Sequence, residues 1–431
     1  MNAQNNNFYK LQLIIAILLS VGSLRAQINS PYSNFGLGNL QQGESIFYNS
    51  MGGIGIGMAS NLYINPSNPA LYAEFDTLSF LFDLGLYSES RNLNTVKEQE
   101  SYNNAGLDYI TFGFSIAKWW KTSFGVVPFS KISYKIVDKS YLEGIGNTTY
   151  YYEGTGSINK AYWGNALKVG GKNYLAVGAN LNYLFGNTKD VQAVMFPDSL
   201  YYFHTKHTQS ITYHDLFLDL GAYVNYEVGE NDEYVLGLGT VYSLGEDLAT
   251  RSTQLSYTYT SAATGVDRIK DTLFFAEDNA TTVGLPQSIG LGFSLKKKNH
   301  YHWGIDVRYQ NWESFHINGA NDMKNHSLRI ASGGQYMPGG ETLGSYWNWV
   351  RYRAGVFFNQ SALSLNETAI NEFGITFGVG LPLRRSRSTI NLGLNIGNRG
   401  TTDQGLIKET SVTFRLGFSI YENWFIQQKF R

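Results

Sequence analysis

The sequence has no cysteine, only 8 prolines, and 16% charged residues, which is below the roughly 25% typical of soluble domains. The lack of cysteine excludes a thiol nucleophile, a thiolate metal site, a disulfide framework and a lipidated N-terminal cysteine. The formal net charge of -1 offers neither a basic footprint nor an acidic tail, so we expect no nucleic-acid partner. After the N-terminal region no run of about 18 apolar residues occurs, so we expect no helical membrane span.

Aromatic residues and glycine are abundant instead. Aromatics make up 15% of the 431 residues, with 31 Tyr and 26 Phe, and there are 46 glycines. This composition suits strands whose two faces meet different media. The chain is long enough for two or three soluble domains, but a single closed barrel could also account for its whole length.

The N-terminus resembles an export signal. A polar start ending at Lys10 precedes the mostly apolar stretch from Leu11 to Val21, and small residues lead to Ala26. The apolar stretch is shorter than the roughly 20 residues needed to cross a bilayer as a helix. We therefore predict a signal peptide over residues 1–26, cleaved after Ala26.

Alternation of large apolar residues with small or polar ones is the strongest pattern in the chain. It is clearest in residues 108–118, 301–310 and 373–381. In the second of these, the non-apolar face carries the charged residues Asp306 and Arg308. The pattern predicts strands with one apolar face. A soluble sandwich also alternates, so the connection lengths must separate the two fold classes.

The spacing of alternating segments predicts fourteen strands. They lie near residues 77–91, 107–118, 122–136, 156–168, 173–187, 211–228, 233–246, 284–296, 301–314, 326–337, 349–360, 370–382, 388–399 and 407–421.

The connections between these strands alternate between tight turns and longer loops, as in outer-membrane barrels. The fold class predicted is therefore all-β, a transmembrane antiparallel β-barrel of about 14 strands. We expect the longer connections to be solvated extracellular loops; they are residues 92–106, 137–155, 188–210 and 247–283.

Tryptophans near strand ends, among them Trp119, Trp120 and Trp312, suggest an interfacial aromatic girdle. His204, His207 and His214 could form a metal cluster, or His214 with Asp215 an acid–base dyad, but they fall in or beside a loop and at a strand start. No Gly-x-Ser-x-Gly motif is present either. We expect no catalytic residue, no metal and no cofactor, and the chain is predicted not to be an enzyme.

Residues 27–76 lack the alternation of apolar and polar residues. They are the part of the chain that is assigned neither to the signal peptide nor to the barrel strands and the tail. They contain Ser-Pro-Tyr-Ser-Asn-Phe-Gly-Leu-Gly at 30–38, Met-Gly-Gly-Ile-Gly-Ile-Gly at 51–57 and Asn-Pro-Ser-Asn-Pro-Ala at 65–70. This segment is predicted to be a hatch or plug in the lumen. The last two motifs, followed by the first barrel strand, resemble the long-chain fatty acid transporter (FadL) family. The 30–38 motif is most similar to its Bacteroidota members.

The resemblance implies a hatch inside a 14-stranded barrel, and an apolar path that leaves sideways through a kinked third strand. By this resemblance Pro128, in the third predicted strand, is the candidate for the kink. A proline tolerated at a non-bonding position remains the alternative. The hatch or gating candidates are Gly53, Gly55, Gly57, Asn65, Pro66, Asn68 and Pro69.

The predicted organisation is a signal peptide at 1–26, a hatch at 27–76, a barrel at 77–421 and a periplasmic tail at 422–431, in the bacterial outer membrane. The first functional hypothesis is uptake of fatty-acid-like apolar molecules. The second is a non-transporting subunit of a protein-secretion or outer-membrane assembly complex, as some relatives are. An outer-membrane hydrolase is a third, weaker alternative. The expected partners are outer-membrane lipid and lipopolysaccharide, an apolar ligand, or a protein.

Overall fold

The computed structural model describes residues 30–423, apart from 199–200, 230–232, 262–265, 318, 320, 322, 324–325 and 340–344. The predicted signal peptide and all but two residues of the predicted tail lie outside the described residues. Fourteen strands form the barrel: β2 (Ser79–Asn94), β3 (Gln99–Ser115), β4 (Trp120–Leu142), β5 (Gly146–Gly170), β6 (Tyr174–Met195), β7 (His204–Val228), β8 (Tyr234–Ser243), β11 (Gln287–Lys297), β12 (Tyr301–Asn311), β13 (His326–Tyr336), β14 (Arg351–Gln360), β17 (Glu372–Pro382), β18 (Thr389–Arg399) and β19 (Lys408–Asn423).

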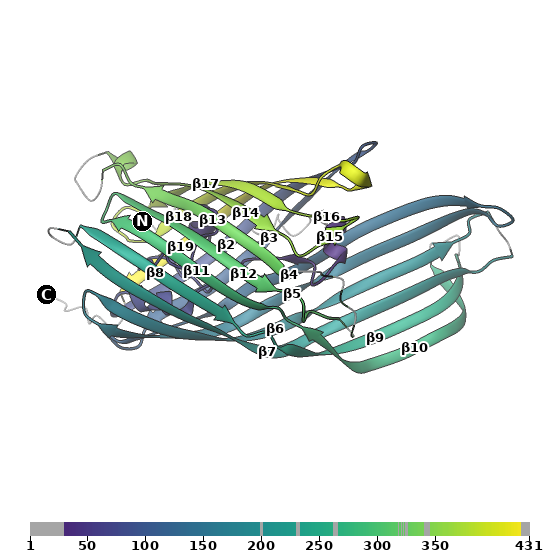
Figure 1. Cartoon of the computed structure of the whole chain (residues 1–431), viewed down its shortest axis with the longest axis horizontal. Helices are drawn as coiled ribbons and strands as arrows, with labels where there is room; N and C mark the ends of the chain where they lie inside the picture. The colour runs from purple at the N-terminus through teal and green to yellow at the C-terminus, as the bar shows by residue number, and fades with distance from the viewer. Residues whose placement is uncertain are drawn as a thin grey trace, which may run out of the picture.

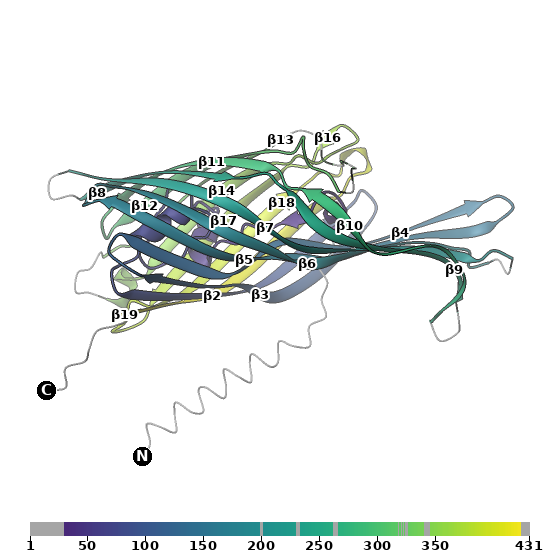
Figure 2. The ribbon, with the colours of Figure 1, turned by 90° about the horizontal axis from the view of Figure 1, so that it is seen from below.

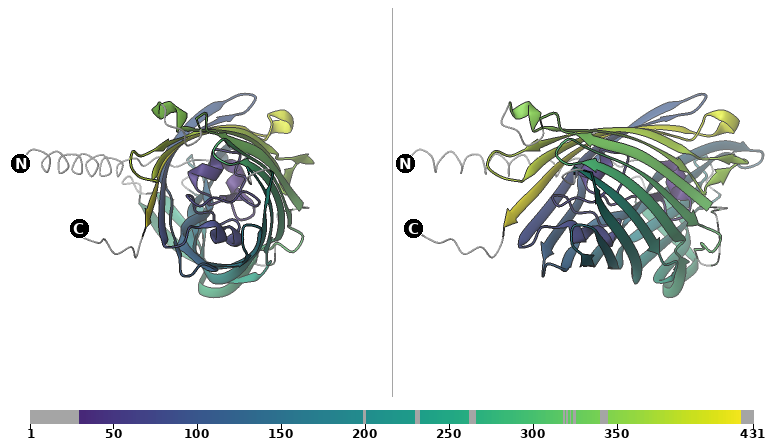
Figure 3. Two further views of the ribbon diagram at one scale, coloured as in Figure 1. Left: turned by 90° about the vertical axis from the view of Figure 1, so that its left-hand side faces the viewer. Right: turned by 60° about the vertical axis from the view of Figure 1, so that its left-hand side comes forward.

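The barrel closes where its last strand meets its first. β19 pairs with β2 from Ser79 opposite Asn423 to Asn94 opposite Lys408, and every pairing between neighbouring strands is antiparallel. The closed cylinder is visible in Figure 1 and end-on in Figure 3. The predicted fold class and the count of fourteen strands are confirmed. Residues Glu422 and Asn423, assigned to the tail by prediction, belong to β19.

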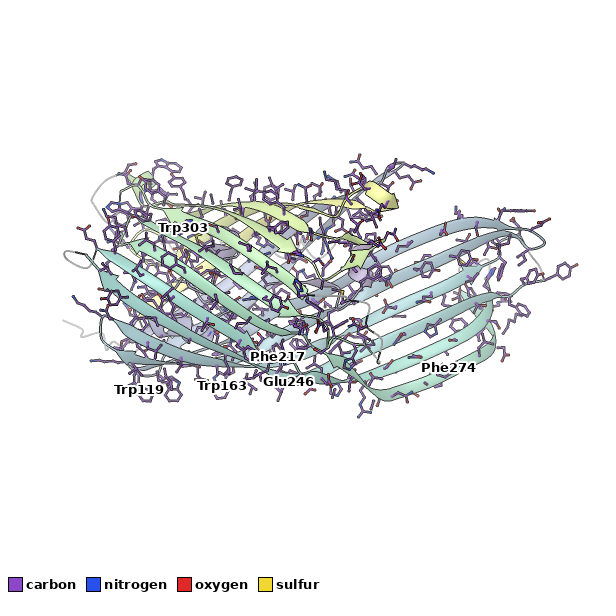
Figure 4. The ribbon with its side chains drawn as sticks, viewed as in Figure 1. Trp119, Trp163, Phe217, Glu246, Phe274 and Trp303 are labelled. Carbon is purple, nitrogen blue, oxygen red and sulfur yellow. The ribbon has the colours of Figure 1, made fainter. Side chains whose placement is uncertain are left out.

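The outer wall follows the predicted alternation. On β17 the side chains of Phe373, Ile375 and Phe377 are 47%, 38% and 48% exposed, whereas Thr376 between them is 1% exposed. Trp119, Trp163 and Trp303 likewise project outward from the wall (Figure 4). Apolar outward faces around a closed barrel match a lipid-facing surface. Within the described part of the chain, no helix is long and apolar enough to span a bilayer.

Most of the tight connections lie at one rim, while at the opposite end residues 95–98 and 143–145 also form short turns at the tips of the long hairpins β2–β3 and β4–β5. The connections at the first rim join β3 to β4, β5 to β6, β11 to β12 and β17 to β18, and we assign this rim to the periplasm by the short-turn rule. At the other rim, loop residues form part of a buried apolar cluster, and we call them the lid. Trp312, predicted to belong to the aromatic girdle, is instead 3% exposed and packs in this lid. The other buried lid residues include Phe315, Met323, Leu363 and Ile370.

A sheet extends from the extracellular rim, and we call it the wing (Figure 2). It consists of the distal parts of β4, β5, β6 and β7 together with the hairpin β9 (Asp247–Ser261) and β10 (Asp267–Gly284), which pairs with β7 through β9. The prediction of loops at 137–155, 188–210 and 247–283 was wrong, because strands occupy most of these residues, and β2 and β3 likewise occupy most of 92–106. Their Tyr, Thr and Val content favours strands, but both faces meet water, so the one-sided apolar alternation used to identify strands is missing.

The remaining short elements belong to the N-terminal segment and the loops. They are η2 (Pro31–Asn34), β1 (Asn39–Leu40), α2 (Ile46–Asn49), η3 (Pro69–Glu74), η5 (Tyr346–Asn348), β15 (Ser364–Leu365), β16 (Thr368–Ala369) and η6 (Asp403–Gly405). The segment from residue 30 to residue 76 runs inside the ring of strands (Figure 3, left). Its buried apolar residues pack with luminal side chains of the wall, which include Leu81, Ala331 and Phe357.

Candidate functional site: the luminal plug and the β3–β4 seam

The two asparagines of the Asn-Pro motif hold the glycine-rich run of the plug. Asn65 Nδ2 donates to the carbonyl oxygen of Gly55 at 2.6 Å, and Asn68 Nδ2 donates to that of Ile56 at 2.7 Å. The side-chain oxygen of Asn68 also accepts from the backbone N–H of Ala70 at 3.0 Å, at the start of η3. Each asparagine therefore fixes a local turn and a second segment together.

The barrel wall holds the same run from the other side. Asp306 Oδ2 on β12 accepts the backbone N–H of Gly55 at 2.5 Å and that of Ile56 at 2.7 Å. Ser294 Oγ on β11 donates to the carbonyl oxygen of Gly57 at 2.7 Å. The sequence-based list of site residues omitted Asp306, although its position on the charged face of the 301–310 strand was a visible signal.

Glycines in the wall allow the plug backbone to approach. A Cβ atom placed on Gly355 would lie 2.2 Å from the carbonyl carbon of Met51, and one on Gly292 would lie 2.3 Å from the amide nitrogen of Gly57. No real Cβ contact is that short, so side chains at these two positions would push the plug away from the wall.

The other predicted hatch residues also lie in the plug. The carbonyl oxygen of Pro66 accepts from Asn180 Nδ2 on β6 at 2.8 Å, and Pro69 opens η3. Gly53 has a φ of +74° and follows Gly52, whose carbonyl oxygen accepts from Arg329. The structure thus brings all seven candidates together, while their role in gating stays a prediction.

A cavity of about 360 Å³ lies between the plug and the lid. Several of its charged residues are paired: Arg91 contacts Glu89 at 2.6 Å and Glu409 at 2.7 Å, and Arg415 contacts Asp108 at 3.1 Å. The cavity is thus far more polar than the continuous apolar path implied by the family resemblance. Its charged residues are Glu44, Glu89, Asp108, Asp219, Glu372, Glu409, Arg91, Lys160, Arg308, Arg329, Arg399 and Arg415.

The wall has a seam between β3 and β4. These two strands share only six residue pairs, from Ile110 opposite Val126 to Ser115 opposite Lys121. Pro128 lies two residues beyond Val126, where the pairing with β3 ends, and the β4–β5 register shifts between Pro128 and Ser130. The structure therefore places the kink candidate at a real irregularity of the third barrel strand, while a role in lateral exit is untested.

The N-terminal segment crosses this seam from the inside, and we call residues 30–41 the strap. Ser30 Oγ donates to Glu409 on β19 at 2.6 Å, while the Ser30 N–H donates to the carbonyl oxygen of Ser133 on β4 at 2.7 Å. Further along, β1 pairs with β4 at Lys131 and Ser130. The strap thus takes the place beside β4 that β3 has left.

One side-chain contact also bridges the seam. Lys131 Nζ on β4 donates to the hydroxyl of Tyr87 on β2 at 2.8 Å and lies 3.9 Å from the centre of the Tyr87 ring. Asn104 on β3 donates to the same hydroxyl at 3.0 Å. In the described ranges, no group of three or more Asp, Glu or His side chains is arranged to hold a metal ion.

The fold and the filled lumen define an outer-membrane β-barrel of the FadL type with an N-terminal plug. The chain belongs to the BamG family, whose model matches residues 8–431. A search of curated proteins found no match.

Solved structures with the same fold include two toluene transporters and a FadL homologue. The toluene transporter TbuX of Ralstonia pickettii is 14% identical, with a TM-score of 0.57 over 88% of this chain and 98% of that one. A FadL homologue of Pseudomonas aeruginosa is 11% identical, with a TM-score of 0.55 over 90% and 99%. The toluene transporter TodX of Pseudomonas putida is 14% identical, with a TM-score of 0.55 over 90% and 99%. At these identities the likeness establishes the fold.

Proposed function

We propose that this chain is a non-transporting subunit of an outer-membrane complex for protein secretion or assembly. In this role the barrel is an anchor in the membrane, and the wing is the part that contacts a protein partner. The family name and the geometry of the wing and lumen support this proposal over uptake of apolar molecules.

The observation that carries the proposal is the size of the wing. β5 and β7 each have 25 residues, whereas β11 and β12 on the far wall have 11. About 14 additional residues per strand correspond to roughly 46 Å of extended chain beyond the rim. A sheet of that length adds nothing to a diffusion path through the lumen, but it offers two faces and two edges to another protein.

The filled lumen also supports the proposal of a non-transporting subunit. The plug is hydrogen-bonded to several wall strands, and the cavity above it is lined by six acidic and six basic side chains. Apolar molecules gain little on moving into a space lined by charges, because the charged groups would lose hydration without new partners. The lumen is therefore better suited to a structural plug than to a hydrocarbon channel.

The test is gentle purification of the chain from its own outer membrane, followed by native mass spectrometry. A variant in which residues 135–152 are replaced by a two-residue turn shortens the β4–β5 part of the wing. A matched control replaces Arg384 and Arg385 by serine at the opposite rim. We expect a stoichiometric protein partner with the wild type and the control, but not with the shortened wing. Absence of any protein partner from the wild type would overturn the proposal.

Uptake of apolar molecules is the second candidate, and the seam between β3 and β4 is the observation in its favour. Similar structures include a toluene transporter and a monoaromatic hydrocarbon channel. A disulfide introduced by Asn39→Cys with Lys131→Cys would fasten the strap to β4, since these residues are register partners. If the chain transports, uptake of toluene or laurate into proteoliposomes exceeds that of protein-free liposomes and falls, reversibly, on oxidation. Uptake equal to that of liposomes would contradict this candidate.

A further inference from the structure

The distal part of β4 forms one edge of the wing, and its outer side is open. β4 pairs with β5 along its whole length, but its pairing with β3 ends at Val126 and its contact with the strap ends at Ser133. Among the described residues, no strand pairs with the outer edge of β4 from Tyr134 to Leu142. We propose that this edge binds an extended acidic segment of a partner protein by strand addition. The inference rests on the proposed function and adds the docking edge and the kind of partner.

The strap shows which backbone groups face outward. The N–H of Ser133 donates to Ser33 Oγ, and its carbonyl oxygen accepts from Ser30. In an antiparallel sheet both backbone groups of a residue point to the same side, and the side alternates along the strand. The β4–β5 register has no irregularity after Ser130. The N–H and C=O groups of Lys135, Val137 and Lys139 therefore point to the open edge.

The strap also shows that this edge accepts main-chain hydrogen bonds, although the strap is extended only at β1 and is helical at η2. Gln41 N–H donates to the carbonyl oxygen of Phe129 at 2.9 Å, and Ser30 N–H donates to that of Ser133 at 2.7 Å. An incoming segment over residues 134–142 would continue the same line of hydrogen bonds toward the tip of the wing. Strand addition uses these main-chain bonds for affinity and the side-chain alternation for specificity.

The side chains along the edge indicate the chemistry of the partner. Lys131, Lys135 and Lys139 share one face, and Glu153 on β5 is the register partner of Lys135, although no ion pair joins them. The other face carries Ile136, which is 36% exposed, between the buried Tyr134 and the exposed Asp138. A segment that alternates acidic and apolar residues would meet the lysines on one face and Ile136 on the other. Charge complementarity of this kind favours specificity.

The opposite edge of the wing does not offer the same site. β10 has three register irregularities against β9, between Ile269 and Asp271, Thr272 and Phe274, and Ala276 and Asn279. Bulges of this kind interrupt a regular edge and discourage strand addition. Phe274 lies on this edge, far from the barrel (Figure 4). The regular edge of β4 is thus the better template for a second chain.

The experiment uses the full chain in detergent micelles and a fluorescein-labelled nine-residue peptide alternating glutamate and valine. The comparison peptide alternates lysine and valine. We expect the acidic peptide to bind at least tenfold more tightly than the basic one. Hydrogen exchange should slow at the amides of Lys135, Val137 and Lys139.

Three variants make the test specific. Lys135→Glu with Lys139→Glu should weaken the acidic peptide at least tenfold and strengthen the basic one. Val137→Pro removes one outward N–H without removing a bond to β5, and should weaken both peptides at least tenfold. Lys189→Glu, on an inner strand of the wing, should change binding less than twofold. Circular dichroism and heat-dependent gel mobility would verify that each barrel is folded.

No binding of the acidic peptide, equal binding of both peptides, or binding unaffected by Val137→Pro would each overturn the inference. Other outcomes distinguish a failure of the proposed function from a failure of this inference. If Val137→Pro leaves a native complex from the outer membrane intact, the partner docks elsewhere and the subunit role stands. If the wild type yields no complex, the subunit role is wrong whatever the peptide does.

Discussion

Asp306 on the barrel wall and Gly55 in the plug are 251 positions apart in sequence and are joined by a hydrogen bond of 2.5 Å. The same carboxylate oxygen accepts from Ile56, so one wall residue fixes two consecutive amides of the glycine-rich run. Charge-assisted bonds to backbone amides are among the stronger hydrogen bonds in proteins. This contact makes the plug an integral part of the barrel.

Replacing Asp306 by alanine should therefore loosen the plug. The change leaves two buried amides without a partner, which costs about 1–3 kcal/mol for each unsatisfied group. We expect faster hydrogen exchange over residues 52–57 with little change in strands such as β12 itself. Asp306→Asn is the matched control, because it keeps an acceptor oxygen and should have a smaller effect. Unchanged exchange in the alanine variant would contradict the prediction.

Asn65 acts on the same loop from the opposite side. Asn65→Ala removes the donor to Gly55 and the acceptor for the backbone of Ser67, and we expect a loss of about 1–3 kcal/mol in the stability of the plug. Because Asn65 and Asp306 hold one short loop, their effects should not be additive in a double-mutant cycle. The measurement is the opening free energy of the Gly55 amide region. Additivity within about 0.5 kcal/mol would mean that the two contacts are independent.

The fourteen strands and the plug residues were predictable for different physical reasons. A strand in a barrel wall must show an apolar face to lipid, so alternation such as that of Phe373, Ile375 and Phe377 is forced by the environment. The plug asparagines were found because Asn-Pro turns and glycine runs are locally unusual. Their partners across the lumen, such as Asp306 and Ser294, depend on contacts over more than 200 residues, which a single sequence does not reveal.

The sequence does not predict the wing or the lid, because neither is forced to show an alternating apolar pattern. Strands that are solvated on both faces need no alternating apolar pattern, so the sequence of β9 and β10 predicts a loop. The position of Trp312 near a strand end predicts an interfacial aromatic residue. It is buried because a loop folds over the barrel mouth, and that folding is set by tertiary packing with residues such as Phe315.

Gly355 should tolerate no side chain, because a Cβ atom there would overlap the backbone of Met51 and Gly52. Gly355→Ala is expected to displace the plug from β14 at a cost of about 1–3 kcal/mol, as in other overpacked cores. Gly397→Ala is the control, since its nearest neighbour would be the hydroxyl of Ser411 at 3.1 Å. Limited proteolysis of the folded barrel, read at the plug, distinguishes the two variants. Equal protection of the plug in the two variants would show that β14 moves to make room for the added methyl group.

Glu409 anchors the strap, since it accepts from Ser30 and pairs with Arg91. Glu409→Gln keeps the size of the side chain and leaves Arg91 paired with Glu89, so the expected loss is that of a hydrogen bond to a charged group, about 1.5–3 kcal/mol. We expect faster hydrogen exchange over residues 30–38, and no change at the tip of the wing. A variant in which the strap stays as protected as in the wild type would place its anchor on β4 alone.

Asp190 on β6 gives the wing a pH dependence. Burial raises the pKa of Asp190 above its ordinary value, although the hydrogen bond of 2.8 Å from the Tyr134 hydroxyl opposes the shift. As the pH rises from about 4, the unfolded wing gives up this proton first, so it binds fewer protons than the folded wing and stability falls. The decline should end once Asp190 has ionised in the folded wing. Opening free energies of the β5 and β6 amides, from hydrogen exchange corrected for the intrinsic rate at each pH, should therefore be larger at pH 4 than at pH 7. Asp190→Asn should remove this difference, and an equal decline in that variant would assign it to another group.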